Sequence, residues 1–194
     1  GMYIHREGES MYSFYLPVWK GVNPQTGLGE FWVDPEDHSK GVTNYYSEAG
    51  STIVGKAMPD VIGGMTNTMT FLDGLLDFSF LISYQSGGSL FDYPGYFTHS
   101  DGFRAASMNA AADAADYWTP TNTDAVYPKP IMNNPYRWDR FSSRLIKSTD
   151  NIRMREMSLG VNVPVDRNVE RLRIYFKTTN PFMIWSATPD IDPD

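Results

Sequence analysis

The sequence predicts an all-β fold of antiparallel, up-and-down strands with one short helix in a long loop, and two observations carry that prediction. Aromatic residues make up 14% of the 194-residue chain, and 16 glycines and 13 prolines divide it into short apolar segments. Such segments between turn residues are typical of strands. Residues 61–85 also alternate between two faces on either side of Asp73 and Gly74, a pattern typical of a hairpin.

Composition and charge exclude several classes of protein. With 16 Lys and Arg against 23 Asp and Glu, the net charge is −7, and the chain has no basic block for nucleic acid. It has no cysteine, which excludes disulfides, Cys-ligated zinc, iron–sulfur clusters and thiol nucleophiles. No apolar run approaches the roughly 18 residues of a transmembrane helix, and residues 1–20 do not resemble a signal peptide.

The N-terminal third predicts short strands and polar turns. Residues 11–19 are rich in β-formers, and Pro17 indicates an edge, a bulge or a strand end there. A turn at 23–27 and a short strand at 30–33 follow. The acidic cluster of Asp34, Glu36 and Asp37 lacks the glycine and the spacing of an EF-hand, so we expect a solvated loop, with a calcium site as the alternative.

The hairpin at 61–85 has one apolar and one polar face. In its second strand Leu76, Phe78, Phe80, Ile82 and Tyr84 share one face, and Asp77, Ser79, Leu81, Ser83 and Gln85 share the other. A soluble sheet would turn the apolar face to a core. A membrane barrel would turn it to lipid and the polar face to a wet lumen, and strands of about ten residues are long enough for that. The pattern by itself leaves both environments open.

Residues 103–118 are rich in alanine and predict the helix. Asp113 and Asp116 would share one face of it, more simply as solvated residues than as an acid–base or metal pair. Residues 119–140 contain four prolines and predict an irregular loop. The aromatic side chains Trp118, Tyr127 and Trp138 are candidates for contact with a ligand, or else they pack the loop on itself.

The C-terminal third predicts two more strands and an irregularity. Apolar residues fall on even numbers at Ile152 and Met154 and on odd numbers from Met157 onward. A change of phase requires one extra residue, so we expect a β-bulge near Arg155 and Glu156. A strand over 172–177 follows, with its charged face formed by Arg171, Arg173, Tyr175 and Lys177.

A search for catalytic patterns finds none. The three histidines are scattered, and the sequence contains no HExxH, GxSxG, P-loop or dinucleotide-binding motif. We therefore expect no catalytic residues, no metal site, no cofactor and no enzyme activity; a hydrolase is the weakest of the alternatives.

Five ordered stretches resemble one family, the SusC/RagA-type TonB-dependent outer-membrane transporters. Residues 55–67 resemble its GKAxPDxxGGxxN motif, residues 18–27 its aWaGvDPeTG turn, and residues 117–124 its rWTPeNTD motif. Residues 142–160 resemble SSR followed by yLRLrniSLGY, and residues 172–180 resemble the penultimate strand. The resemblance covers nearly the whole chain.

The resemblance implies a piece of a transmembrane β-barrel in the outer membrane of a Gram-negative cell. It implies TonB-driven import of glycans or peptides, with a SusD-like lipoprotein and TonB as partners, and no cofactor. The polar face would then line the lumen, and its candidate residues are Asp77, Arg153, Arg155, Arg171, Arg173 and Tyr175.

The departures from the family pattern set further expectations. The plug, the TonB box and the last strand are missing, so residues 1–194 resemble a C-terminal barrel segment, with 103–118 as a helical insertion in an extracellular-type loop. Pro181 stands where the family usually has leucine. Such a segment would not transport by itself and would self-associate in water. The alternative function is a soluble cell-surface carbohydrate-binding β module.

Overall fold

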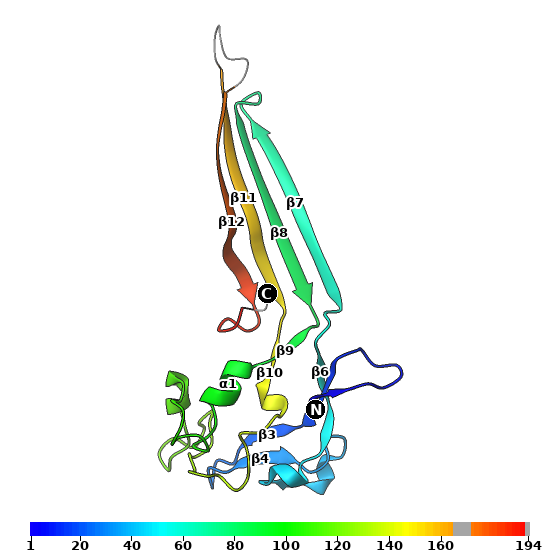
Figure 1. Ribbon diagram of the computed structural model, residues 1–194, viewed down its shortest axis with the longest axis vertical. Coiled ribbons are helices and arrows are strands. Elements are labelled where there is room, and N and C mark those ends of the chain that lie inside the picture. Colours follow the sequence, from blue (N-terminus) through cyan, green and yellow to red (C-terminus); the bar gives the residue numbers. More distant parts are fainter. Residues whose placement is uncertain (165–171, 193–194) are drawn as a thin grey trace. The chain divides into compact units, whose positions relative to one another are not determined.

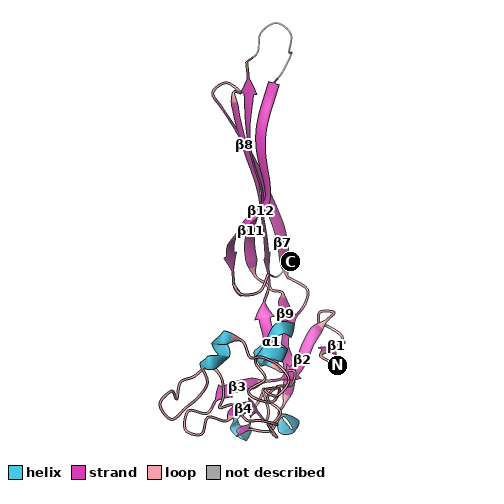
Figure 2. Cartoon of the chain, turned by 60° about the vertical axis from the view of Figure 1, so that its left-hand side comes forward, coloured by secondary structure: helices cyan, strands magenta, loops and turns pink. Residues whose placement is uncertain are grey.

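The computed structural model of the chain describes residues 1–164 and 172–192 (Figure 1). The described part contains many strands and one α-helix, which confirms the predicted fold class. Figure 2 shows the strands in magenta and the short helical segments in cyan. The chain forms two compact units that alternate along the sequence. The first contains Gly1–Met58 and Ser89–Lys147, and the second contains Pro59–Gly88 and Ser148–Asp194.

The first unit is built from small sheets. One sheet has the order β1-β2-β6, formed by β1 (Tyr3–Ile4), β2 (Ser13–Pro17) and β6 (Ser51–Lys56). A second has the order β3-β4-β5, formed by β3 (Trp19–Val22), β4 (Gly29–Trp32) and β5 (Val42–Thr43). The strand β9 (Ser89–Phe91) pairs with β10 (Ile146–Ser148). Pro17 ends β2, as its missing backbone donor requires.

Aromatic side chains form the core of the first unit. Phe14 from β2, Phe31 from β4 and Trp138 from the long loop are each at most 1% exposed. The Trp19 ring meets Phe31 edge-on, with centroids 5.0 Å apart. Rings of this size bury more apolar area than any other side chain, so a few of them suffice to hold short strands and loops together.

The second unit is a single four-stranded sheet with the order β12-β11-β8-β7. Its strands are long: β7 (Val61–Phe71), β8 (Leu76–Ser86), β11 (Asn151–Val163) and β12 (Leu172–Ser186), all paired antiparallel (Figure 1). Residues 89–147 connect β8 to β11. The strands therefore run up and down, with one very long connection between the middle pair.

A tight turn joins β7 to β8. The Leu75 amide donates to the Leu72 carbonyl at 3.0 Å. The two residues between them, Asp73 and Gly74, have φ of 52° and 91°. Positive φ at both central positions is what a two-residue type I′ hairpin needs, and Asp-Gly is a preferred pair for it. The predicted hairpin is confirmed.

The helix predicted over 103–118 is wrong. The α-helix α1 (Tyr93–Thr98) lies earlier in the chain, and 103–118 contains turns and the 3₁₀ helix Ala112–Ala115. Alanine propensity is a weak determinant when a helix has no apolar face to pack. Here Arg104 instead donates to the Tyr96 carbonyl at 2.7 Å, a tertiary contact that an isolated helix would not provide. In the described residues, no helix has the length and apolarity for a membrane crossing.

Candidate functional site

The sheet of the second unit has two chemically different faces. Register brings apolar residues of all four strands into the same rows, for example Met69, Phe78, Leu159 and Phe176, or Phe71, Leu76, Val161 and Ile174. The other face carries Asp77, Ser79, Glu156, Ser158 and Arg173. Leu76 and Ile82 thus lie opposite to Asp77 and Ser79, as the sequence pattern predicts.

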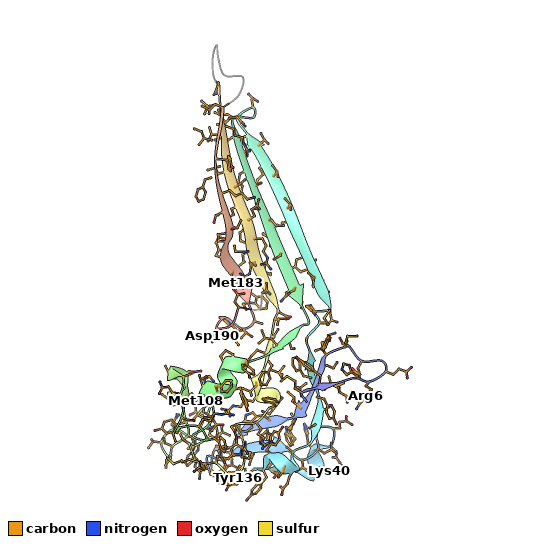
Figure 3. The ribbon with its side chains drawn as sticks, in the orientation of Figure 1. Arg6, Lys40, Met108, Tyr136, Met183 and Asp190 are labelled. Atoms are coloured by element: carbon orange, nitrogen blue, oxygen red, sulfur yellow. The ribbon has the colours of Figure 1, made fainter. Side chains whose placement is uncertain are left out.

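The apolar face of this sheet is open. Many of its large side chains are exposed, among them Phe176 at 70% and Trp185 at 51%, and those of Leu76, Phe78, Phe80 and Ile82 in β8 are half-buried. Figure 3 shows the side chains that project from the strands of this sheet. Across the described residues, every apolar side chain that is fully buried lies in the first unit. A sheet with an uncovered apolar face is unstable in water, because the exposed area loses the hydrophobic stabilisation that a core would provide.

Aromatic residues lie at both ends of the apolar face, Tyr84 and Trp185 at one and Phe71 at the other. Tyr84, Ile152 and Trp185 form one row near the long connection, and Leu76 lies on the same face near the Asp73–Gly74 turn. From Leu76 to Tyr84 the strand rises about 27 Å at ~3.4 Å per residue, or roughly 21 Å along a membrane normal at the usual tilt. That height is close to the ~25 Å apolar band of outer-membrane barrels, which aromatic girdles flank.

Ion pairs cross the polar face. Arg173 of β12 contacts Asp77 of β8 at 2.6 Å, across the intervening β11. Gly160 of β11 makes that contact possible, since a Cβ there would lie 2.6 Å from an Asp77 carboxylate oxygen and 2.8 Å from Arg173 Nη2. Farther along, Lys177 pairs with Glu156 at 2.8 Å, and the Ser79 and Ser158 hydroxyls are 2.9 Å apart.

The structure places three of the six residues predicted to face a lumen on this polar face. Register and contacts put Asp77, Arg173 and Tyr175 there. Arg153 is nearly buried and bonds to Asp192. Arg155 donates from Nε to the Ser83 hydroxyl at 2.7 Å. Arg171, the sixth candidate, lies outside the described residues.

The predicted β-bulge is confirmed. Met154 pairs with Ile82 of β8 and Glu156 pairs with Leu81, so Arg155 is the extra residue. On the other side, Met154 pairs with Phe182 of β12 and Glu156 with Thr179. Asn180 and Pro181 therefore lie in the same irregularity. A proline lacks a backbone donor, and a bulge is one of the few places in a sheet that tolerate it.

The loop aromatics differ from one another in exposure. Trp138 is 1% exposed, and its Nε1 donates to the Asn44 carbonyl at 2.9 Å, so it packs the loop instead of touching a ligand. Trp118 is half-buried and donates to the Pro24 carbonyl at 3.0 Å. Tyr127 is half-buried as well and stacks on the His99 ring, with centroids 4.9 Å apart.

A polar cluster around Asp113 was not expected from the sequence. One carboxylate oxygen of Asp113 lies 2.8 Å from His99 Nε2, and the other accepts from the Tyr127 hydroxyl at 2.9 Å. The hydrogen bond with His99, reinforced by that from Tyr127, lowers the pKa of Asp113. Burial and the Asp113 hydrogen bond raise the pKa of Tyr127. Because His99 is 14 residues from Asp113 in the chain, no local pattern could have paired them.

The acidic cluster near residue 34 forms a turn. Asp34 accepts from the backbone amide of Glu36 at 2.9 Å and pairs with Lys40 at 2.6 Å. The hydrogen bond from Lys40 is the main cause that lowers the pKa of Asp34. In residues 1–164 and 172–192, no three His, Asp or Glu side chains gather into a group that could hold a metal ion.

Known proteins resemble this chain in sequence. TonB-dependent receptor P3 of Formosa agariphila is 26% identical over 209 residues, which cover 98% of this chain and 19% of the receptor. TonB-dependent receptor P26 of the same organism is 27% identical over 207 residues, with 96% and 19% covered. The chain thus spans about a fifth of the length of these curated relatives. No family model matches it.

Solved structures share the fold. The RagAB peptide transporter matches with a TM-score of 0.74 and 22% identity, over 89% of this chain and 19% of the other. The RagAB peptide importer in its open-open state matches with a TM-score of 0.75 and 21% identity, over 90% and 19%. Over nearly its whole length the chain is thus similar in sequence to one segment of TonB-dependent receptors and in fold to one segment of the RagAB transporter.

Proposed function

We propose that this chain is part of an outer-membrane, TonB-dependent import receptor for nutrients, either peptides or glycans. One observation carries the proposal: in the described residues, a single sheet presents an apolar face whose side chains are half-buried or exposed and an opposite face crossed by ion pairs. Lipid stabilises the first face and a wet lumen solvates the second. The relatives named above are receptors and transporters, which agrees with the proposal.

In this proposal the four long strands are part of the barrel wall. The short Asp73–Gly74 turn faces the periplasm and the long connection of residues 89–147 faces the outside, since such barrels have short periplasmic turns and long extracellular loops. Asp77, Arg153, Arg155, Arg173 and Tyr175 line the lumen. By resemblance, a SusD-like lipoprotein covers the outer end and TonB supplies energy from inside.

The alternative of a soluble carbohydrate-binding module is less well supported. It requires the aromatic side chains of the loop to contact a sugar, and one of the three, Trp138, is buried. It also leaves the apolar face of the sheet without a partner, which costs free energy in water.

Two neighbouring residues of β12 test the lipid-facing assignment. Phe176 and Tyr175 are both aromatic and both largely exposed, at 70% and 63%, but they lie on opposite faces. We expect Phe176→Glu to destabilise the receptor by on the order of 1–2 kcal/mol, because the carboxylate enters hydrocarbon. Tyr175→Glu adds an anion near Arg173 and Lys177, so it should have little effect.

The measurement is the free energy of unfolding of the complete gene product in lipid vesicles, from urea titration followed by tryptophan fluorescence. If both side chains faced water, the two substitutions would be equivalent. Equal effects of the two variants would contradict the proposal.

A further inference from the structure

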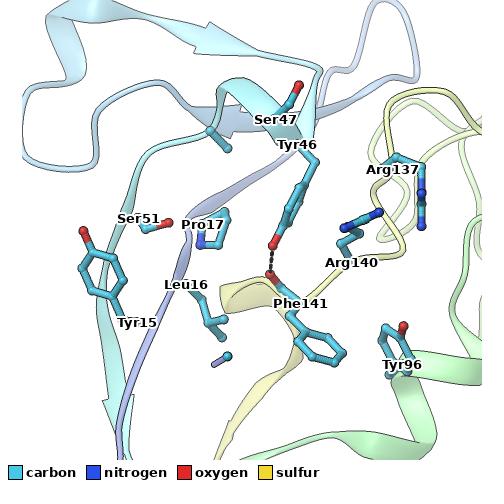
Figure 4. A pocket seen from close by; sticks show the side chains of 12 residues that line it. Tyr15, Leu16, Pro17, Tyr46, Ser47, Ser51, Tyr96, Arg137, Arg140 and Phe141 are labelled. Atoms are coloured by element: carbon cyan, nitrogen blue, oxygen red, sulfur yellow. Dashed lines mark hydrogen bonds between the residues drawn. The ribbon is translucent and has the colours of Figure 1, made fainter. Parts of the chain in front are cut away.

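A cavity of about 700 Å³ lies within the first unit, between β2, the 3₁₀ helix Tyr46–Glu48, α1 and the loop at residues 137–141 (Figure 4). Leu16, Pro17 and Phe141 supply apolar wall, and Tyr15, Tyr46 and Tyr96 supply aromatic rings. The cavity is large enough for a ligand of a few residues.

The cavity wall is held in place by its own hydrogen bond. The Tyr46 hydroxyl donates to the Phe141 carbonyl at 3.0 Å, across the cavity wall shown in Figure 4. Burial raises the pKa of Tyr46, so the phenol stays protonated and keeps donating through the physiological range. The Tyr46 ring therefore has a fixed position before any ligand arrives.

The charge at one side of the cavity is positive. Arg137 pairs with the buried Asp139 at 3.0 Å, and Arg104 approaches the same carboxylate at 3.5 Å. Arg140 forms no ion pair with any residue that the structure describes; its guanidinium lies 5.9 Å from the centroid of the Tyr46 ring. Arg137 and Arg104 thus share one carboxylate, and the charge of Arg140 is available to a ligand.

The charged side chains that line the cavity are both cationic. Its side chains offer guanidinium, phenol and serine hydroxyl groups, and no Asp, Glu, Asn or Gln lines it. A neutral sugar carries no charge to match the guanidinium of Arg140, whereas a carboxylate forms a stronger, charge-assisted hydrogen bond with it. A ligand with a carboxylate beside an apolar side chain would pair with the charge of Arg140 and pack against the apolar walls of the cavity.

We propose that this cavity binds the carboxylate of a short peptide, with Arg140 as its anchor and the apolar wall against a neighbouring side chain. The assignment rests on the proposed function as an import receptor and names the substrate class at this site. A charge-assisted hydrogen bond of this kind contributes roughly ten- to a hundredfold in affinity.

The test uses the complete gene product in nanodiscs, with a random heptapeptide library in two forms, free acid and C-terminal amide. Peptide retained by the immobilised receptor is quantified by mass spectrometry, and affinities of the retained peptides by calorimetry. We expect the acid to bind at least tenfold more tightly than the amide, and Arg140→Gln to abolish that difference. Arg140→Lys, which keeps the charge, should restore part of it.

Arg6→Gln is the matched control, because it removes one positive charge at an exposed position outside the cavity. Equal binding of acid and amide, retention of neither, or an unchanged Arg140→Gln variant would overturn the proposal. So would Arg140-dependent binding of uronate oligosaccharides in place of peptides. Uptake that requires the receptor gene but not Arg140 would overturn this site alone, whereas uptake independent of the gene would overturn the proposed function.

Discussion

The functional side chains of this protein make their main contacts with residues that are distant in the sequence. Arg173 reaches Asp77 because Gly160, in the strand between them, has no side chain. Asp113 is held by His99 and Tyr127, each 14 residues away. In both cases the type of each residue is plain from the sequence, but the partner is determined by the fold.

The His99–Asp113 pair makes a prediction about pH. The pKa of Asp113 is lowered in the folded protein, so its contribution to stability is present above the ordinary pKa of aspartate and is lost as pH falls through the lowered value. Because the side chain is 63% exposed, solvent screens the effect and the contribution is small. We expect His99→Asn to raise the pKa of Asp113.

Carboxyl carbon NMR of the Asp113 resonance as a function of pH measures that pKa directly. His38→Asn serves as a control, because it removes a histidine that stacks on Trp32 elsewhere in the unit. The account of the cluster fails if the Asp113 midpoint is the same in wild type and His99→Asn.

At the scale of elements, the bulge at Arg155 keeps the apolar side chains of β11 on the same face of the sheet along the whole strand. On one side of it, Ile152 and Met154 face the apolar side, and on the other side Met157, Leu159 and Val161 do. Without an extra residue, one half of the strand would turn its apolar side chains to the polar face, because side chains alternate with a period of two.

Deletion of Arg155 should therefore prevent assembly of the barrel. The expected result is loss of the heat-modifiable folded form from outer membranes, measured by electrophoresis with and without boiling. Arg155→Ala keeps the extra residue and removes only the side-chain contacts, so this variant should assemble at near wild-type levels. A deletion variant that assembles normally would show that the bulge has no such role.

At the scale of the whole molecule, the two units differ in how they are stabilised. The first buries Phe14, Phe31 and Trp138 in a core. The sheet of the second relies on strand pairing and on polar contacts across one face, and its apolar side chains are half-buried or exposed. The first unit is therefore stable in water, whereas the apolar face of the second is stabilised only by contact with another apolar surface.

The isolated 194-residue chain should self-associate in water for that reason. We expect sedimentation velocity to show oligomers in buffer and a shift towards monomer in detergent micelles, which cover the apolar face. The Phe176→Glu variant should weaken the association and Tyr175→Glu should not. A chain that is monomeric without detergent would contradict this prediction.

Much of the fold of the second unit could be predicted from the sequence alone. The period-two alternation, the Asp73–Gly74 turn and the change of phase at Arg155 are local patterns, and they set the hairpin, the two faces and the bulge because a strand places alternate side chains on opposite sides. Only the tertiary structure decided that 103–118 is not helical, that Trp138 is buried, and that His99 meets Asp113 and Arg140 borders a cavity. Each of these depends on contacts between distant segments, which override weak local propensity and leave no periodic trace in the chain.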